Sequence, residues 1–192
     1  MTLARKACAS IVLGLALAGT WQVAAGSWVH AKALLAQHLI AHAWAGSHEG
    51  GTAHRPWPGA DLRPIARMTL RGRGVTLFVL DAASPRTLAF GPGHVGGTAP
   101  PGSWGNTVIV GHRDTHFAFL KNVALDDEID IEGRRGTPAR YRVRELAIVD
   151  QGESRVLDAA DASQLTLITC YPFDAVQPGT RLRYVVIAER VG

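Results

Sequence analysis

The chain has 192 residues, of which 47% are hydrophobic, and these values suit one globular domain with appended segments. Its two cysteines, Cys8 and Cys170, cannot build a disulfide framework, and no Cys-x-x-Cys pair suggests a zinc ribbon or a thioredoxin-like redox site. The formal net charge is +4, but the basic residues are scattered rather than gathered in one block, so nucleic-acid binding is not predicted.

The first segment, residues 1–29, is typical of a membrane anchor. Arg5 and Lys6 precede a run from Ala7 to Val29 that contains no Asp, Glu, Lys or Arg. At about 1.5 Å per residue, a helix of this length crosses a hydrocarbon core of about 30 Å. The basic residues before it favour an orientation with the rest of the chain outside the cytoplasm. A cleaved signal peptide is the alternative, because the letters VAAG supply small residues near the end of the run.

Two further segments precede the main domain. Residues 30–46 predict an amphipathic helix, because apolar residues recur there at roughly helical spacing. They are Ala31, Leu34, Leu35, Leu39 and Ala43. Residues 47–64 mix Gly, Pro and charge without a period, which is typical of a linker or an extended strap. We therefore expect the folded domain to cover residues 65–192.

The domain at residues 65–192 consists of short, turn-bounded segments with the alternation of β-strands. The candidate strands are residues 66–70, 74–81, 86–92, 106–111, 127–133, 139–150, 164–170 and 182–190. Only short helical pieces fit, near residues 114–123 and 157–163. This density of strands predicts a mostly-β fold, a closed or nearly closed barrel of about eight strands, and argues against an alternating βαβ sheet.

Three residues with useful chemistry stand at strand ends or on the last strand. Cys170 ends QLTLITC, His112 follows NTVIVG, and Arg183 lies in TRLRYVV. A thiol can act as a nucleophile, a histidine can protonate a departing amine, and an arginine can donate hydrogen bonds to an oxyanion. Together these groups suit acyl transfer through a thioester. Taken singly, they also suit a small core residue, a turn residue and an exposed strand face.

The wording around these residues resembles the sortase family of cysteine transpeptidases. TLITC matches a T-L-x-T-C pattern, NTVIVGHRD places G-H at the end of an earlier strand, and LRYVV supplies an arginine after the cysteine. GHRDTHFAFL and TCYPF are most similar to the class D type. The flanking stretches WQVAAGSWVHAKALLAQHLIAHAW and RTLAFGPGHVGGTAPPGSWGNTVIVGHRDTHF resemble the Gram-negative sortases, called class GN or marine proteobacterial type.

This resemblance implies an eight-stranded sortase-type barrel and a set of roles. Cys170 attacks the threonine carbonyl of an LPxTG-like C-terminal sorting signal on a target protein and forms an acyl-enzyme. His112 is the general acid for the leaving amine and then the base for the amine acceptor, and Arg183 bonds the substrate backbone or the oxyanion. The partners are the target protein, the amine acceptor and the inner membrane, with the catalytic domain on the periplasmic side.

Two rival residues remain beside this set. Arg181 shares a strand face with Arg183, because side chains two residues apart point the same way. His116 lies four residues after His112, a spacing that binds zinc in H-E-x-x-H helices. Here Arg113 stands where that motif has glutamate, so no metal site and no cofactor are predicted.

Thr169 and His94 are candidate substrate-binding residues. The Thr169 hydroxyl either contacts the substrate or braces the end of its strand. His94 lies in the glycine-rich stretch GPGHVGG, which either borders a substrate groove or forms a simple turn.

Three alternative functions fit part of the pattern. An L,D-transpeptidase also orders His before Cys, but its nucleophile follows a Ser-x-Gly pattern and not Ile168-Thr169. A thiol peptidase would release the same acyl-enzyme to water. A membrane-tethered periplasmic β-barrel that only binds ligands would leave Cys170 buried and inert.

Overall fold

The computed structural model describes residues 11, 13–16, 19–22, 34–47, 54–134, 138–177 and 179–191. The chain forms two units, Met1–His38 and Leu39–Gly192. Most of the predicted anchor at residues 1–29 lies outside the described residues. Within the described ranges, no helix has both the length and the apolar character needed to cross a membrane.

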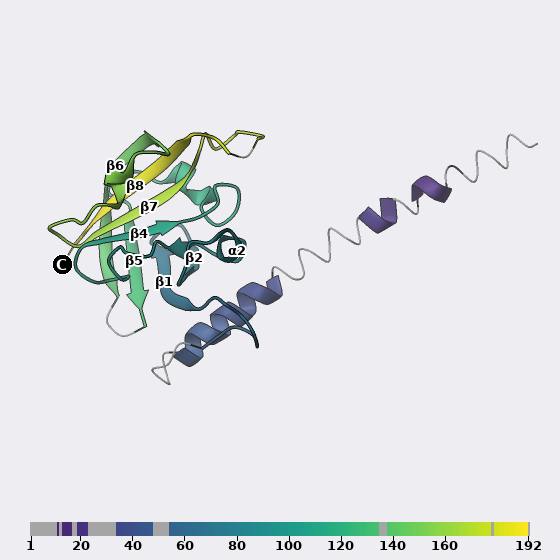
Figure 1. The fold of residues 1–192 in the computed structure, drawn as a ribbon, viewed down its shortest axis with the longest axis horizontal. Helices are drawn as coiled ribbons and strands as arrows, with labels where there is room; N and C mark the ends of the chain where they lie inside the picture. Colours follow the sequence, from purple (N-terminus) through teal and green to yellow (C-terminus); the bar gives the residue numbers. More distant parts are fainter. Residues whose placement is uncertain are drawn as a thin grey trace, which may run out of the picture. The chain divides into compact units, whose positions relative to one another are not determined.

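The second unit is a closed β-barrel with eight strands among the described residues (Figure 1). The strands are β1 (Pro64–Leu70), β2 (Val75–Leu80), β3 (Gly93–His94), β4 (Asn106–Val110), β5 (Glu128–Gly133), β6 (Ala139–Asp150), β7 (Gln164–Tyr171) and β8 (Leu182–Arg190). Around the barrel they follow the order β1-β2-β3-β4-β7-β8-β6-β5. The β2–β3 and β4–β7 pairs are parallel and the others antiparallel. The prediction of a closed eight-stranded barrel is confirmed.

Two of the predicted elements are wrong, and local capping explains both. Residues 86–92 do not form a strand, because Ser84 accepts a hydrogen bond from the Thr87 amide and starts the helix α2 (Pro85–Leu88). The missing strand is the two-residue β3. Residues 158–163 are not helical, because the helical turn η2 (Ser154–Leu157) starts earlier, at its N-cap Glu153, and ends at Asp158, whose backbone is extended. The predicted helical piece near 114–123 is confirmed as η1 (Ala118–Asn122).

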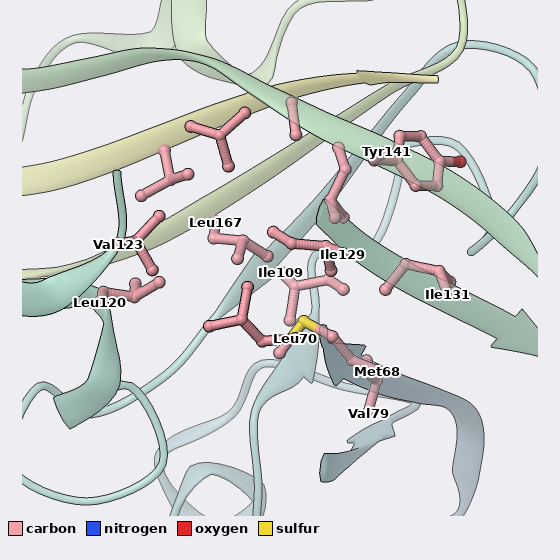
Figure 2. Close-up of a cluster of buried hydrophobic side chains, with 14 of the residues drawn as sticks. Met68, Leu70, Val79, Ile109, Leu120, Val123, Ile129, Ile131, Tyr141 and Leu167 are labelled. Atoms are coloured by element: carbon pink, nitrogen blue, oxygen red, sulfur yellow. The ribbon is translucent and has the colours of Figure 1, made fainter. Parts of the chain in front are cut away.

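The barrel interior is filled by the alternate side chains of the strands (Figure 2). Ile109 of β4, Leu167 of β7 and Val186 of β8 are all fully buried there. Figure 2 shows Leu120 and Val123 at one end of this cluster and Ile131 and Tyr141 at the other. Because successive residues of a strand point to opposite faces, the residues between these core positions lie on the outside of the barrel.

A smaller apolar cluster attaches the preceding segments to the barrel. A helix covers residues 34–47, and within the second unit Ile40 packs with Leu62 and Leu80. Trp44 contacts Phe78, with ring centroids 6.3 Å apart. Residues 54–63 therefore act as a strap against the barrel wall and not as a free tether.

Truncating a core side chain of β7 tests the packing of the barrel. Leu167→Ala removes a fully buried side chain, and we expect the free energy of unfolding to fall by about 2–5 kcal/mol. Urea denaturation followed by far-ultraviolet circular dichroism measures the change. Val176→Ala is the control, since Val176 is 98% exposed and its truncation is expected to cost less than about 0.5 kcal/mol. Equal costs for the two variants would contradict the packing.

Candidate active site

Cys170 and Arg183 face one another across neighbouring strands. The antiparallel register of β7 and β8 pairs Cys170 with Arg183 and, two residues earlier on β7, Ile168 with Val185. Directly paired residues share a face of the sheet and have Cβ atoms about 4.5–5.5 Å apart. The predicted nucleophile and the predicted arginine are therefore neighbours at the same end of the barrel wall.

His112 reaches the same level from the other side of β7. The parallel β4–β7 register ends with Val110 beside Ile168, and the Gly111 amide then donates to the Ile168 carbonyl at 3.2 Å. His112 lies two residues beyond Val110, just as Cys170 lies two residues beyond Ile168. The structure thus brings the ends of β4, β7 and β8 together around Cys170.

The shared face is the outside of the barrel and not its core. Leu165 and Leu167 point into the interior, so Ile168 and Cys170, on the opposite face of β7, point outward. Ile168 belongs to a separate outer cluster. This cluster is built on Val108, Ile168 and Val185. Cys170 itself is a free, half-buried thiol. It stands at the edge of an apolar outer surface, where a bound chain can reach it.

The structure separates the two candidate arginines. Arg183 is half-buried, and its Nη1 donates to the Thr180 carbonyl at 2.6 Å and to the Leu182 carbonyl at 2.9 Å. Its Nη2 donates to Gln151 Oε1 at 3.1 Å. Arg181 precedes β8, is largely exposed and pairs with Asp150. The register thus places Arg183, and not Arg181, opposite Cys170.

A cavity of about 190 Å³ lies beside Arg183, between β8 and the β6–β7 loop. Its apolar lining is Val149, Val156, Leu157 and Ile168. Val156 and Leu157 belong to η2, so this helical turn forms a wall over the outer apolar cluster. The cavity offers an apolar site beside Arg183, the residue that pairs with Cys170.

Asn106 holds that wall in place. Its amide nitrogen donates to the carbonyls of Val156 and Asp158, each at 3.1 Å, and its Oδ1 accepts from the Thr166 hydroxyl at 2.7 Å. Asn106 is 3% exposed, so these bonds satisfy groups that water does not reach. Sequence reasoning missed this residue, because its partners lie about fifty positions away along the chain.

The two candidate substrate-binding residues, Thr169 and His94, make hydrogen bonds within the barrel domain. Thr169 is buried, and its hydroxyl donates to the Gly111 carbonyl at 2.7 Å, which braces the end of β7 against the turn that carries His112. His94 pairs with Ile109, a core position, and its Nε2 lies 2.9 Å from the Ala99 carbonyl. A substrate contact by either residue stays a prediction.

A second histidine, His116, lies near His112, and His112 affects its pKa. Burial lowers the pKa of His116 below its ordinary value of 6.5, and the neighbouring His112 lowers it further. A hydrogen bond to the backbone of Ala89 acts in the opposite direction on the pKa. His116 is thus a half-buried neighbour of the predicted catalytic histidine with a lowered pKa, whereas His112 is exposed.

The sequence of this chain is similar to a known protein family and to one of its characterised members. A family model described as the sortase domain matches residues 68–191. Sortase D of Bacillus subtilis (strain 168) is 28% identical over 116 residues, which are 60% of this chain and 58% of that protein's length.

Solved structures share the barrel. Sortase A from Corynebacterium diphtheriae is 30% identical, with a TM-score of 0.62 over 70% of this chain and 63% of that one. Sortase C-1 from Actinomyces oris is 28% identical, with a TM-score of 0.60 over 67% of this chain and 75% of that one. A Clostridium perfringens Sortase D5 transpeptidase is similar in fold, with a TM-score of 0.64, 21% identity, and coverage of 82% of this chain and 96% of that one.

The lowered pKa of His116 predicts a pH-dependent contribution to stability. A histidine whose folded pKa is depressed stabilises the fold at pH values above 6.5, and this contribution is lost as the pH falls through the folded pKa. Between pH 7 and about pH 5, the wild type is expected to lose more unfolding free energy than His116→Gln. Nuclear magnetic resonance titration of the imidazole measures the pKa directly. A titration midpoint above 6.5 would contradict the burial of this ring.

Removing the Thr169 hydroxyl tests the brace at the end of β7. Thr169→Val keeps the shape of the side chain but leaves the Gly111 carbonyl without this donor, so the free energy of unfolding should fall by about 1–3 kcal/mol. Thr76→Val is the matched control, because Thr76 is exposed on β2 and its loss is expected to stay within about 0.5 kcal/mol. Denaturant titration of both variants gives the comparison.

Proposed function

This chain belongs to the sortase family, and from that membership we propose that it is a cysteine transpeptidase that cleaves an LPxTG-like sorting signal. The product is transferred to an amine. The observation that carries the proposal is the register that pairs Cys170 with Arg183, while β4 delivers the turn of His112 to the other side of β7. A cysteine that served only to fill the core would not require an arginine and a histidine at the neighbouring strand ends.

In the first half-reaction the Cys170 thiol passes its proton to His112, and the sulfur attacks the threonine carbonyl of the sorting signal. A bond forms between sulfur and carbon, and the carbonyl electrons move onto the oxygen of a tetrahedral intermediate. As the intermediate collapses, the carbon–nitrogen bond breaks and His112 gives a proton to the departing amine of the glycine. The products are a thioester on Cys170 and the released C-terminal peptide.

The second half-reaction runs the same steps with a new amine. His112 removes a proton from the incoming amine, whose nitrogen attacks the thioester carbon. The carbon–sulfur bond breaks, and the proton on His112 returns to the Cys170 sulfur. No oxidant, reductant or metal is needed to balance these steps.

Arg183 and the cavity beside it supply the binding. An arginine whose donors reach the oxyanion contributes about 10²–10³-fold to the rate when it acts as an oxyanion-hole donor. The neighbouring cavity, lined by Val149, Val156, Leu157 and Ile168, suits an apolar side chain such as the leucine of the signal. The peptide then lies along the outer cluster with its threonine at Cys170.

We extend the proposal to the setting of the enzyme. The charge-free run from Ala7 to Val29, with Arg5 and Lys6 before it, supports a single-pass anchor in the inner membrane and a catalytic domain on the periplasmic side. The stretches that flank the catalytic motifs support the Gram-negative type of sortase. The amine acceptor is then a periplasmic or surface molecule with a free primary amine.

Trapping the thioester tests the proposed function. The full chain in detergent is incubated with a peptide that ends in an LPxTG-like signal, with and without a glycine oligomer as the amine. Mass spectrometry is expected to find the acyl group on Cys170, and Cys170→Ala is expected to lower turnover by at least about 10³-fold. Cys8→Ala is the matched control and should keep full activity, because Cys8 has no role in the mechanism.

Each other outcome points to one rival. Release of the acyl group to water despite abundant amine identifies a thiol peptidase. Acylation by a peptidoglycan peptide but by no sorting signal identifies an L,D-transpeptidase-like enzyme. Peptide binding with no acyl group on Cys170, or full turnover by Cys170→Ala, rejects catalysis by this thiol and leaves a binding protein.

A further inference from the structure

Arg113, the residue after His112, has a buried guanidinium with every donor in use. It is 6% exposed, and a guanidinium carries five N–H groups. Its Nε lies 3.2 Å from Asp114 Oδ1, and its Nη2 donates to the carbonyls of Ala175 and Gln177 at 2.6 and 3.2 Å. Its Nη1 donates to the Pro172 carbonyl at 2.9 Å and makes a long, 3.5 Å contact with Thr180 Oγ1.

Four of these five acceptors belong to the loop that connects β7 to β8. Figure 1 shows this loop, in yellow, extending beyond the ends of the two strands. Among its described residues, one backbone–backbone hydrogen bond closes the loop on itself, from the Ala175 amide to the Pro172 carbonyl at 3.4 Å. Phe173 packs against the barrel core, but most of the hydrogen bonds to the described part of the loop come from the guanidinium and not from the loop's own backbone.

The chemistry of the contact requires an arginine. Three main-chain carbonyls converge on one planar group from different directions, and each takes a different N–H. A lysine offers three donors from one nitrogen atom and cannot match this fork. Among the described residues, Asp114 is the only carboxylate within ion-pair distance of Arg113, and it is largely exposed. The buried charge of Arg113 therefore depends on the loop carbonyls for its compensation.

The contact joins all three strand ends of the active site. Arg113 follows His112 directly, and the loop it holds starts just after Cys170. At the far end of the loop, the carbonyl of Thr180 accepts from Arg183 Nη1 at 2.6 Å. Arg113 thus contacts the same short segment that fixes the guanidinium of Arg183.

We propose that Arg113 is a positioning residue that clamps the β7–β8 loop beside Cys170 and, through Thr180, sets the place of Arg183. The inference rests on the proposed function for its catalytic consequence, but the clamp itself does not depend on it. When the clamp is lost, the loop moves away from Cys170 and Arg183 loses its carbonyl anchor. Misplacement of about 1 Å at such a site costs about 10²-fold in rate.

Hydrogen exchange and kinetics of two variants test the clamp in the full chain. In Arg113→Met and Arg113→Lys, we expect the amides of residues 173–177 to exchange at least about tenfold faster while the barrel strands keep their protection. We expect kcat for the sorting peptide to fall about 10–100-fold, with a smaller change in KM. Arg67→Met is the matched control, because Arg67 is an exposed arginine paired with Glu132 and should leave both readouts unchanged.

Chemical rescue separates positioning from general stability. Millimolar guanidinium is expected to restore part of kcat and of the loop protection in Arg113→Ala, because the ion can occupy the vacated site. A variant that is merely less stable gains nothing from a denaturing ion. If Arg113→Met does not fold, Arg113→Lys carries the test, since it keeps the stem and the positive charge.

Two results would overturn the clamp. The first is native exchange and native kcat in Arg113→Lys, which would show that the fork of donors is not needed. The second is faster exchange throughout the barrel in both variants, which would make Arg113 a residue of the fold as a whole. Absence of an acyl-enzyme in the wild type sinks the proposed function alone, because hydrogen exchange of the loop still reports on the clamp.

Discussion

The candidate site depends on one constraint, the pairing of β7 with β4 on one side and β8 on the other. The register matches Val110 with Ile168 and Cys170 with Arg183, and the alternation of each strand then decides which side chains look outward. A slip of one residue in either pairing would turn Cys170 into the core and carry Leu167 to the surface. The fully buried Leu167 and Ile109 therefore keep Cys170 on the outer face, because any other register would expose these core side chains to water.

The loops around the site follow a different rule, because they have no ladder of backbone hydrogen bonds. Their carbonyls are satisfied by single buried side chains, Asn106 for the β6–β7 loop and Arg113 for the β7–β8 loop. Asn106 is the first residue of β4, and Arg113 follows the other end of the same strand, one residue beyond the predicted catalytic histidine. Side chains at the two ends of one strand thus hold both loops beside the site.

The sequence predicted most of what regular periodicity encodes. The long alternation around Leu167 and Val186 identified β7 and β8, and with them the strand ends that carry Cys170 and Arg183. The periodicity failed where local geometry decides: Ser84 and Pro85 start a helix in a segment of strand-like composition, and β3 is too short to show a pattern. The buried hydrogen-bonding role of Arg113 could not be predicted from the sequence, for a different reason. Arg113 contacts carbonyls about sixty positions away, and nothing in a single sequence marks a carbonyl as waiting for a donor.

The hydrogen bonds of Arg183 explain how one arginine can be fixed in place and still receive a substrate. Its Nη1 is held by two main-chain carbonyls, those of Thr180 and Leu182, which are parts of the framework. Its Nη2 is held by the side-chain amide of Gln151, which can rotate away. Under the proposed mechanism, a substrate oxygen replaces the Gln151 oxygen, so one neutral acceptor is exchanged for another and the guanidinium itself does not move. Stabilisation of the developing charge then needs little reorganisation, which is the condition under which such a donor is most effective.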